Sequence, residues 1–410
     1  MIKIQNKKDC CGCAACVQRC PKQCISLKED KEGFLYPVVE ENSCIDCGLC
    51  EKVCPWLNRS RKIPPKEVLA VKNRNEKERL ASSSGGVFIA LAKKVLENGG
   101  VVFGAVFDEN WEVKHTCAEA LDSVRPMMGS KYLQSRIGDS FRDAERYLKE
   151  GREVLFTGSP CQIRALHNYL RRDYSNLLAV DFLCHGVPSP GVWRRYLAET
   201  FYSTQMTVVG KDTVLSSSPK FLPVITGIEF RDKTQCGWKK YSFVVRGKFT
   251  SEADHNSVLL SDIHRDNPFM KGFLSDMCLR PSCYGCKCKN GASHSDLTIA
   301  DYWGISRIMP DFDDDKGVGL VLLNTDKGCG IFYSLGMEVR TSNLVDANHG
   351  NGGFKEHVTI PPKREFFFDD LSHGMTVSNA VSHVLYIPPY KKIFLRMRGR
   401  IRNLIRKIIK

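Results

Sequence analysis

CCGCAACVQRCP (residues 10–21) and CIDCGLCEKVCP (residues 44–55) share the spacing C-x2-C-x2-C-x3-C-P and lie 34 residues apart. Eight thiolates at this spacing are typical of two cubane 4Fe-4S clusters, and the fourth cysteine of each motif binds the cluster of the other motif. We therefore predict two clusters, the first held by Cys10, Cys13, Cys16 and Cys54, the second by Cys44, Cys47, Cys50 and Cys20.

A pair of zinc sites is the alternative for this region. Zinc would use two C-x2-C pairs and leave two cysteines of each motif without a role. The match at all eight positions and both prolines favours the clusters. Cys11 and Cys24 lie outside the pattern, and we expect them to be small packed side chains nearby. Residues 1–57 are thus predicted to form a ferredoxin-type domain, which carries electrons and does no bond chemistry itself.

Length and composition limit the class of protein. A chain of 410 residues predicts about two or three domains, and 42% hydrophobic with 26% charged residues describes a soluble globular protein. No apolar run approaches the roughly 18 residues that cross a bilayer. The start of the chain lacks the apolar segment of a secretory signal. We therefore expect a cytoplasmic protein whose nineteen cysteines serve mainly for metal rather than for disulfides.

The remainder of the chain alternates short apolar runs with helical patterns. Residues 58–66, NRSRKIPPK, have the composition of a linker. Helices are expected at about residues 84–98, 162–171 and 190–201, each after a strand-like run. We predict an α+β multidomain fold in which a mixed α/β domain follows the ferredoxin-type domain, with residues 67–205 as its first part and residues 206–370 as its second.

Two junctions between a strand and a helix have the composition of anion sites. SSSGG (82–86) and TGSPCQ (157–162) place hydroxyl groups and glycines at a helix N-terminus. There the backbone N–H groups and the helix dipole favour an anion. An ordinary serine N-cap is the alternative at each junction. Two such junctions in one domain indicate a nucleotide or flavin site.

Four later cysteines stand in loops at the ends of predicted strands: Cys161, Cys184, Cys283 and Cys286. Such loops can converge on a metal, so these four are candidate ligands of a third 4Fe-4S cluster, with Cys278 and Cys288 as spare candidates. Unrelated packed thiols are the alternative, because spacing over more than a hundred residues carries no geometric information. His185 is a candidate proton donor or an ordinary structural histidine.

Together these motifs resemble the family of beta subunits of coenzyme F-420 (deazaflavin) hydrogenases and dehydrogenases, in the bacterial form with a fused dicluster ferredoxin. The resemblance runs from about Cys10 to Thr325. Its carrying motifs are SSSGGVF (82–88), GSKYLQS (129–135), LFTGSPCQIRAL (155–166), VDFLCHGVPSP (180–190), FRDK (230–233), LRPSCYGCK (279–287) and SDLTIADYWG (295–304).

This resemblance implies a flavin-binding iron–sulfur oxidoreductase with FAD in the α/β domain. The flavin-site residues that it implies are Ser83, Ser84, Gly85, Gly86, Lys131, Tyr132, Gln134, Thr157 and Gly158. Lys131 and His185 are the candidate catalytic residues. A cation such as Lys131 near the N1/O2 edge of a flavin stabilises its reduced form, and His185 would donate a proton. The implied partner is ferredoxin or another redox protein. Bacterial relatives often occur with surface-polysaccharide enzymes, and deazaflavin itself is not assumed.

The C-terminal tail carries most of the net charge of +14. Residues 391–410, KKIFLRMRGRIRNLIRKIIK, contain nine Lys or Arg and no Asp or Glu. Apolar residues recur every three or four positions, which predicts a basic amphipathic helix within residues 388–410. We expect it to contact an anionic membrane surface, which would place the protein at the inner face, or a partner. Docking on the protein's own body is the alternative. Nucleic acid is not expected, since no reader motif accompanies the charge.

Two functions follow. In the first, a donor such as reduced ferredoxin feeds the two N-terminal clusters, and the flavin exchanges a hydride with an organic substrate, with a glycan precursor as one candidate. In the second, the chain is an electron-transfer subunit that serves a partner enzyme and has no organic substrate of its own.

Overall fold

The computed structural model describes residues 1–202, 223–249, 256–354 and 357–388. The amphipathic helix predicted for residues 388–410 lies outside the described residues, apart from Pro388. In the part of the chain that is described, no helix is both long and apolar enough to cross a membrane.

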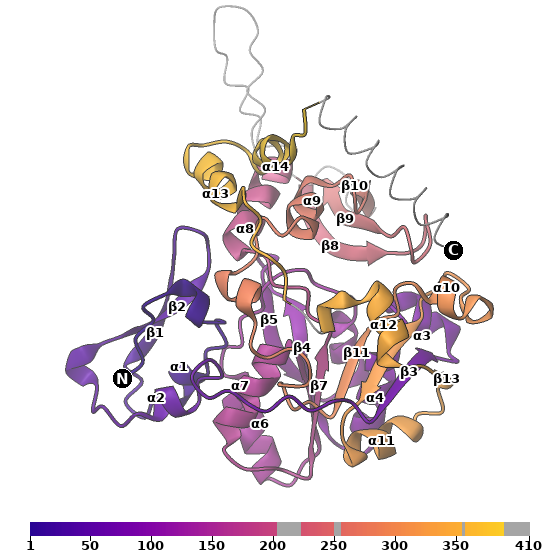
Figure 1. Cartoon of the computed structure of the whole chain (residues 1–410), viewed down its shortest axis with the longest axis horizontal. Coiled ribbons are helices and arrows are strands. Elements are labelled where there is room, and N and C mark those ends of the chain that lie inside the picture. Colours follow the sequence, from indigo (N-terminus) through magenta and orange to yellow (C-terminus); the bar gives the residue numbers. More distant parts are fainter. Residues whose placement is uncertain (203–222, 250–255, 355–356, 389–410) are drawn as a thin grey trace, which may run out of the picture.

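The N-terminal lobe is built around the two cysteine motifs. Two short helices, α1 (Ala15–Arg19) and α2 (Leu49–Lys52), carry the third cysteine of each motif, and the hairpin β1 (Ile25–Glu29) and β2 (Leu35–Val39) lies between them in sequence. Ala14 and Gly48 start the two helices at φ of 57° and 70°. These left-handed residues turn the chain sharply around each motif. Figure 1 shows the lobe at the left, beside α6 and α7.

One large mixed sheet forms the body. Its strand order is β13-β3-β12-β11-β7-β6-β4-β5. The strands are β3 (Glu67–Lys72), β4 (Val101–Phe107), β5 (Val113–Ala118), β6 (Val154–Gly158), β7 (Leu177–Phe182), β11 (Leu297–Asp301), β12 (Gly319–Leu323) and β13 (Glu338–Thr341). Strands from both predicted parts, before and after residue 205, therefore share this sheet. The predicted mixed α/β architecture is confirmed.

Alternation along the strands assigns side chains to the two faces of the sheet. Val101 and Phe103 face α6 (Ser140–Lys149) and α7 (Pro160–Leu170), in a core that also contains buried cysteines of the N-terminal lobe. Val102 faces α4 (Val87–Glu97) on the other side. The remaining helices near this sheet are α3 (Glu76–Ala81), α5 (Leu121–Val124), α10 (Ile305–Ile308), α11 (Asp326–Tyr333) and α12 (Leu344–Gly350).

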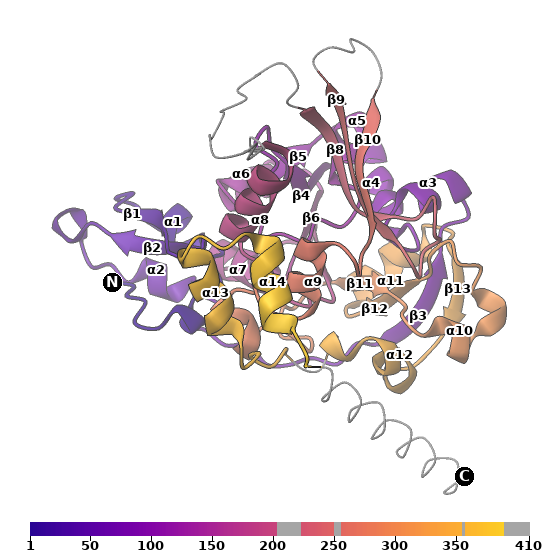
Figure 2. The same cartoon turned by 90° about the horizontal axis from the view of Figure 1, so that it is seen from above.

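A smaller antiparallel sheet covers one edge of the large one (Figure 1). It has the order β10-β9-β8 and packs with four helices around a separate aromatic core. Its elements are β8 (Pro223–Asp232), β9 (Ser242–Phe249) and β10 (Ser257–Ile263), with α8 (Pro190–Leu197), α9 (Pro268–Leu274), α13 (Arg364–Ser372) and α14 (Val377–Leu385). Viewed from above, α13 and α14 lie between the N-terminal lobe and α9 (Figure 2).

The covered edge is the carboxyl edge of the parallel strands. β4, β6, β7 and β11 run in one direction, and β3 shares it because β12 is antiparallel to both β3 and β11. The residues that follow these strands therefore meet at one edge, where ligands of open α/β sheets usually bind. The contact between Phe107, at the end of β4, and Phe230 of β8 places the small sheet over this edge.

Gly85 shows how closely the loop before α4 packs. A Cβ at this position would lie 2.4 Å from the Val71 carbonyl oxygen and 2.5 Å from the Gly319 nitrogen. Both atoms belong to the backbone at the strand ends and cannot rotate away. We expect Gly85→Ala to lower the free energy of unfolding by about 1–3 kcal/mol in denaturant titrations.

Gly330→Ala in α11 is the matched control for this substitution. Within the described residues, a Cβ at Gly330 meets nothing within 4 Å. It should leave stability unchanged or raise it by roughly 0.4–1 kcal/mol. Equal losses for both variants would show that the contact at Gly85 is not the cause.

Candidate functional site

The first predicted set of cysteines comes together beside α1 and α2. Cys10 and Cys54 are near neighbours of Cys16, and Cys16 and Cys54 are near neighbours of Cys13. Burial, with the neighbouring thiols, raises the pKa of Cys16 to about 12. Burial also raises the pKa of Cys54. Because metals bind thiolates, such buried thiols suit a site where iron supplies the positive charge.

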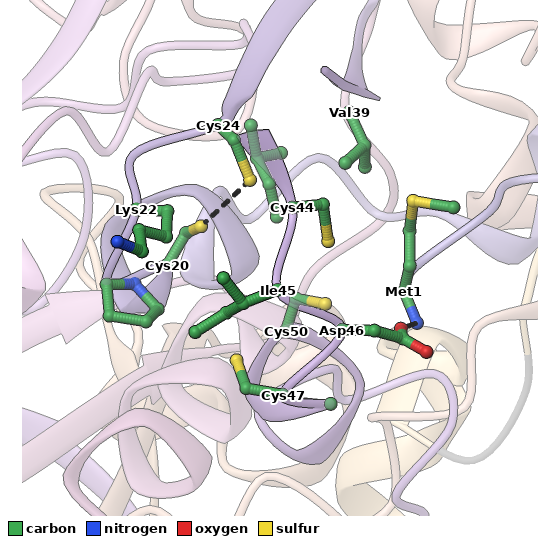
Figure 3. A pocket seen from close by; sticks show the side chains of 13 residues that line it. Met1, Cys20, Lys22, Cys24, Val39, Cys44, Ile45, Asp46, Cys47 and Cys50 are labelled. Atoms are coloured by element: carbon green, nitrogen blue, oxygen red, sulfur yellow. Dashed lines mark hydrogen bonds and ion pairs between the residues drawn. The ribbon is translucent and has the colours of Figure 1, made fainter. Parts of the chain in front are cut away.

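The second predicted set lines a pocket at the surface of the lobe (Figure 3). Cys20 of the first motif lies there with Cys44, Cys47 and Cys50 of the second. Cys47 is exposed. Cys24 lies in the same pocket, with its Sγ 3.4 Å from that of Cys20. The fold therefore places Cys20 beside three cysteines of the other motif, as the predicted exchange requires, and ligation by these four stays a prediction.

The structure also brings together the four later cysteines. Segments 184–189 and 278–283 run side by side, since Ser189 N donates to Cys278 O and Arg280 N donates to Val187 O, both at 2.9 Å. Val187 N also lies 3.5 Å from Cys283 Sγ.

Cys161, in the first turn of α7, completes this third group of thiols. Its Sγ lies 3.2 Å from Ser159 Oγ. Burial, reinforced by Cys283, Cys161 and Cys286, raises the pKa of Cys184 well above its usual range. The four side chains thus share one partly buried region, although they come from three separate segments of the chain.

Cys11 connects the first and third groups. Its strongest interactions are with the thiols of Cys13, in the first group, and Cys161, in the third. Its thiol in turn raises the pKa of Cys161. Cys288 lies beside Cys286, whose pKa it lowers to about 6. Within the described residues, no three His, Cys, Asp or Glu side chains are placed to hold a single metal ion. Interacting thiols thus lead from Cys13 in the lobe through Cys11 to Cys161 in the domain built on the large sheet, hereafter the large domain.

The loops predicted to bind flavin meet at the carboxyl edge of the sheet. Ser83 Oγ accepts hydrogen bonds from Ser130 N at 2.6 Å and from Ser130 Oγ at 2.9 Å. This contact holds segment 82–86 against segment 129–131. Gly86 caps α4 at φ 81°, and no side chain caps this helix. Backbone N–H groups at the start of α4 therefore remain for other acceptors.

Lys131 is the cation of this region. Its Nζ donates to the carbonyl oxygens of Met128 at 2.9 Å, Gly129 at 3.3 Å and Met127 at 3.4 Å. None of these partners is charged, and no ion pair of Lys131 occurs among the described residues. Burial lowers the pKa of Lys131 to about 7. An anion bound here would restore the charge on this amine.

Other predicted flavin residues use their side chains within the protein. Ser84 Oγ donates to Val318 O at 2.9 Å, and Thr157 Oγ1 donates to Phe103 O at 2.9 Å. Gln134 Nε2 donates to Cys11 O at 3.0 Å, so Gln134 links the GSKYLQS loop to the first cysteine motif. A Cβ at Gly158 would meet Gln162 at 3.2 Å. These four residues shape the loops.

Sequence reasoning missed Arg231, which lies in the FRDK segment at the end of β8. This buried guanidinium pairs with Asp301 at the end of β11 and lies over the rings of Tyr241 and Trp303, at 4.5 and 5.0 Å. Its Nε and Nη2 are buried without a hydrogen-bond partner. Such unsatisfied donors are costly and suit a site that receives an oxygen-bearing ligand.

Aromatic rings lie between Arg231 and Lys131. Tyr132 packs edge-on against Phe230, with centroids 5.6 Å apart, and Phe230 stacks on Phe107 at 6.4 Å. Lys131 Nζ lies 5.9 Å from the Phe107 centroid. The two cations therefore flank one aromatic cluster under the small sheet.

His185 lies on the other side of this aromatic cluster. Its Nε2 is 2.5 Å from Asp276 Oδ1, and its ring packs edge-on against Phe273, which stacks on Tyr132 at 4.8 Å. This contact with Asp276 keeps the imidazole in place at a half-exposed position. Its role as a proton donor stays a prediction.

Comparison with known proteins gives two domain matches. Residues 151–343 match the model of a family described as the C terminus of the coenzyme F420 hydrogenase/dehydrogenase beta subunit, and residues 9–58 match that of the 4Fe-4S dicluster domain. The F subunit of the F420H2 dehydrogenase of Methanosarcina mazei is 24% identical over 267 residues, which cover 62% of this chain and 68% of that protein.

Two further similarities extend over different shares of the chain. The coenzyme F420-dependent sulfite reductase of Methanocaldococcus jannaschii is 28% identical over 166 residues, 40% of this chain and only 26% of that protein. A chain of the F420-reducing NiFe hydrogenase complex of Methanosarcina barkeri aligns over 79% of this chain and 92% of its own length, with a TM-score of 0.44 and 15% identity.

Proposed function

Because this chain belongs to the family of coenzyme F420 hydrogenase/dehydrogenase beta subunits and carries a 4Fe-4S dicluster domain at residues 9–58, we propose that it is an oxidoreductase that passes electrons between iron–sulfur clusters and a flavin-type cofactor. The carrying observation is the path of thiols that leads from exposed Cys47 through Cys11 to Cys161. Iron–sulfur clusters carry single electrons, and a flavin converts them to two-electron chemistry.

Three ligand sets are proposed along this path. The N-terminal sets are Cys10, Cys13, Cys16 with Cys54, and Cys44, Cys47, Cys50 with Cys20. The third set is Cys161, Cys184, Cys283 and Cys286, whose shared burial supports a cluster ligated by all four. Cys288 neighbours the last of them and is the alternative ligand. Cys11 interacts with a member of the first set and a member of the third, so clusters bound by these sets would lie on either side of it.

The residues at the carboxyl edge fit an anionic flavin-type cofactor. Lys131 lacks a charged partner among the described residues, Arg231 has two unsatisfied donors, and the start of α4 has no side-chain cap. FAD is the cofactor proposed from the sequence, and deazaflavin, the coenzyme in the relatives' names, is the other candidate. Lys131 and Arg231 would hold the negative charge or carbonyl oxygens of either.

A basic cleft beside the third set supports an acidic protein as a second redox partner, in addition to the one that meets Cys47. The cleft has a volume of about 310 Å³, and Cys286 of the third set lines it together with Arg59, Lys62, Lys287 and Lys289. No Asp or Glu lines it within the described residues. Clusters of one charge steer partners of the opposite charge. The glycan precursor as substrate and the contact of the tail with lipid stay predictions from the sequence.

Anaerobic reconstitution of the full chain tests the proposal. We expect about twelve iron atoms per chain for three clusters, together with tightly bound FAD or deazaflavin that is reduced after the clusters. Turnover with an added organic acceptor supports an enzyme. Reduction without turnover, until a partner protein is added, supports an electron-transfer subunit. Clusters that never acquire either flavin under any reconstitution would contradict the proposal.

The affinity for the flavin is expected to depend on pH through Lys131. Its lowered pKa of about 7 means that the free amine is mostly neutral at higher pH. A bound anion favours the protonated amine, so above about pH 7 binding takes up a proton, and affinity falls by up to about tenfold per pH unit. Fluorescence titrations of FAD between pH 6 and 9 measure this slope.

Two variants of Lys131 serve as controls. Lys131→Gln should bind weakly and lose the slope. Lys131→Arg stays charged across this range, so it should also lose the slope but retain affinity. A slope that persists in Lys131→Gln would assign the pH dependence to another group.

A further inference from the structure

Arg280 is a fully buried cation at the contact between the N-terminal lobe and the large domain, with 0% exposure. Its Nε donates to Cys10 O at 2.8 Å, its Nη2 to Leu35 O at 2.9 Å, and its Nη1 to Gln134 Oε1 at 2.9 Å. Its Nη2 also lies 3.7 Å from Cys10 Sγ. The guanidinium thus reaches from the LRPSCYGCK segment to a proposed ligand of the first cluster.

The surroundings of Arg280 contain no conventional counter-ion. No carboxylate contacts its guanidinium within the described residues; its partners are backbone carbonyls, the amide of Gln134 and the faces of Tyr36 and Phe34, at 4.3 and 5.3 Å. Burial raises the pKa of Tyr36, so its phenol is neutral. An unpaired buried charge is very costly. The group able to balance Arg280 is the thiolate set that includes Cys10.

We propose that Arg280 is the electrostatic partner of the cluster held by Cys10, Cys13, Cys16 and Cys54, and that it raises the reduction potential of this cluster. This inference rests on the proposed function. Gain of one electron makes a cluster more negative by one charge, and no proton or bond changes. A cation fixed in a poorly polarisable interior stabilises that reduced form.

The positions of the two cysteine sets indicate the direction of electron transfer that a raised potential of the first cluster would favour. The second set opens to the surface at Cys47, where a redox partner can deliver an electron. The first set lies deeper and adjoins Cys11, which leads to Cys161. A raised potential of the first cluster favours transfer of an electron from the second cluster at the surface to the first cluster, next to the large domain. Arg280 therefore acts through the first cluster: it shifts the distribution of the electron between the two clusters.

Arg364 provides a matched control. It too is buried and ties the same lobe to the large domain, but through a carboxylate: Nη1 and Nη2 contact Glu32 at 3.0 and 2.6 Å, and Nη2 donates to Leu279 O at 2.9 Å. Loss of either arginine should weaken the contact between lobe and domain. Only loss of Arg280 should change a cluster potential.

The test is a redox titration of the reconstituted full chain, followed by electron paramagnetic resonance. In Arg280→Gln, the ratio of reduced to oxidised first cluster should fall about tenfold or more at a fixed potential, which equals about 59 mV for one electron. Arg280→Lys should retain most of the ratio. The second cluster should be unchanged in both variants, and Arg364→Gln should match the unmodified chain in both clusters.

A second substitution covers the case in which Arg280→Gln fails to assemble. Gln134→Glu places a carboxylate of the same shape against Nη1. It neutralises Arg280 without removing it and should lower the same ratio. Full cluster content with an unchanged first-cluster potential in both Arg280→Gln and Gln134→Glu would overturn the inference, and so would an equal shift in Arg364→Gln. Absence of clusters from the unmodified chain would instead overturn the proposed function.

Discussion

Cys20→Ser is expected to abolish the second cluster and leave the first intact, although Cys20 belongs to the first motif. The side chain lies in the pocket formed by Cys44, Cys47 and Cys50. Loss of a ligand should remove about four iron atoms per chain. Cys54→Ser should do the reverse and remove the first cluster, since Cys54 neighbours Cys10 and Cys16. Iron and sulfide analysis with electron paramagnetic resonance distinguishes the two clusters.

Cys24 is the control that this experiment needs. Its Sγ is only 3.4 Å from that of Cys20, so any iron that remains in the pocket of Cys20→Ser would be held by this thiol. Cys24→Ser alone should keep all of the iron, and the double variant Cys20→Ser, Cys24→Ser should lose the second cluster completely. If Cys20→Ser removed the first cluster's signal instead, the exchange of fourth cysteines would be wrong. Zinc in place of iron and sulfide would overturn the redox function as a whole.

Cys283→Ser is expected to remove a third cluster and to disconnect the flavin from the N-terminal clusters. Its thiol is buried with Cys161 and Cys286, and burial raises its pKa to about 12. We expect a loss of about four of about twelve iron atoms. Reduction of the bound flavin through the N-terminal clusters should slow by at least about a hundredfold, because the remaining path crosses the protein without a relay. Iron analysis and stopped-flow absorbance measure the two effects.

Two further cysteines test which thiols hold this cluster. Cys278→Ser is the control on the same segment: Cys278 is even more buried than Cys283, and its pKa is raised by burial and lowered by Arg364, with no cysteine of the third set among the causes. It should keep all of the iron. Cys288→Ser should keep it as well if Cys184 is the fourth ligand. Full iron in Cys283→Ser, with loss in Cys278→Ser, would contradict the proposed set.

The local features were predictable because local chemistry determines them. The C-x2-C spacing turns the chain around a metal within a few residues, and the helices expected at 84–98, 162–171 and 190–201 occur at Val87–Glu97, Pro160–Leu170 and Pro190–Leu197. Ser159 forms the capping box at the start of α7, so the serine-cap alternative describes that junction in the structure.

The sequence pattern did not predict the order of the strands in the sheet. β12 and β13 pair with the two edges of β3, although more than two hundred residues separate both strands from β3 in the sequence. Apolar periodicity states which face of a strand is buried, but it does not name the neighbouring strand. For the same reason, the motifs did not show which of the predicted flavin-site residues have side chains free for a ligand. Gln134 and Thr157 stand in motifs that predict ligand contacts, but their side chains form hydrogen bonds within the protein.

By itself the sequence determined the ferredoxin-type lobe, its eight thiols and the α/β character of the body, because each depends on residues a few positions apart. Only the tertiary structure decided that Cys161, Cys184, Cys283 and Cys286 share one partly buried region, and that Arg280 lies 3.7 Å from Cys10 Sγ. Those groupings depend on how the sheet and the lobe pack together. Packing acts between segments that are distant in sequence, so no local spacing records it.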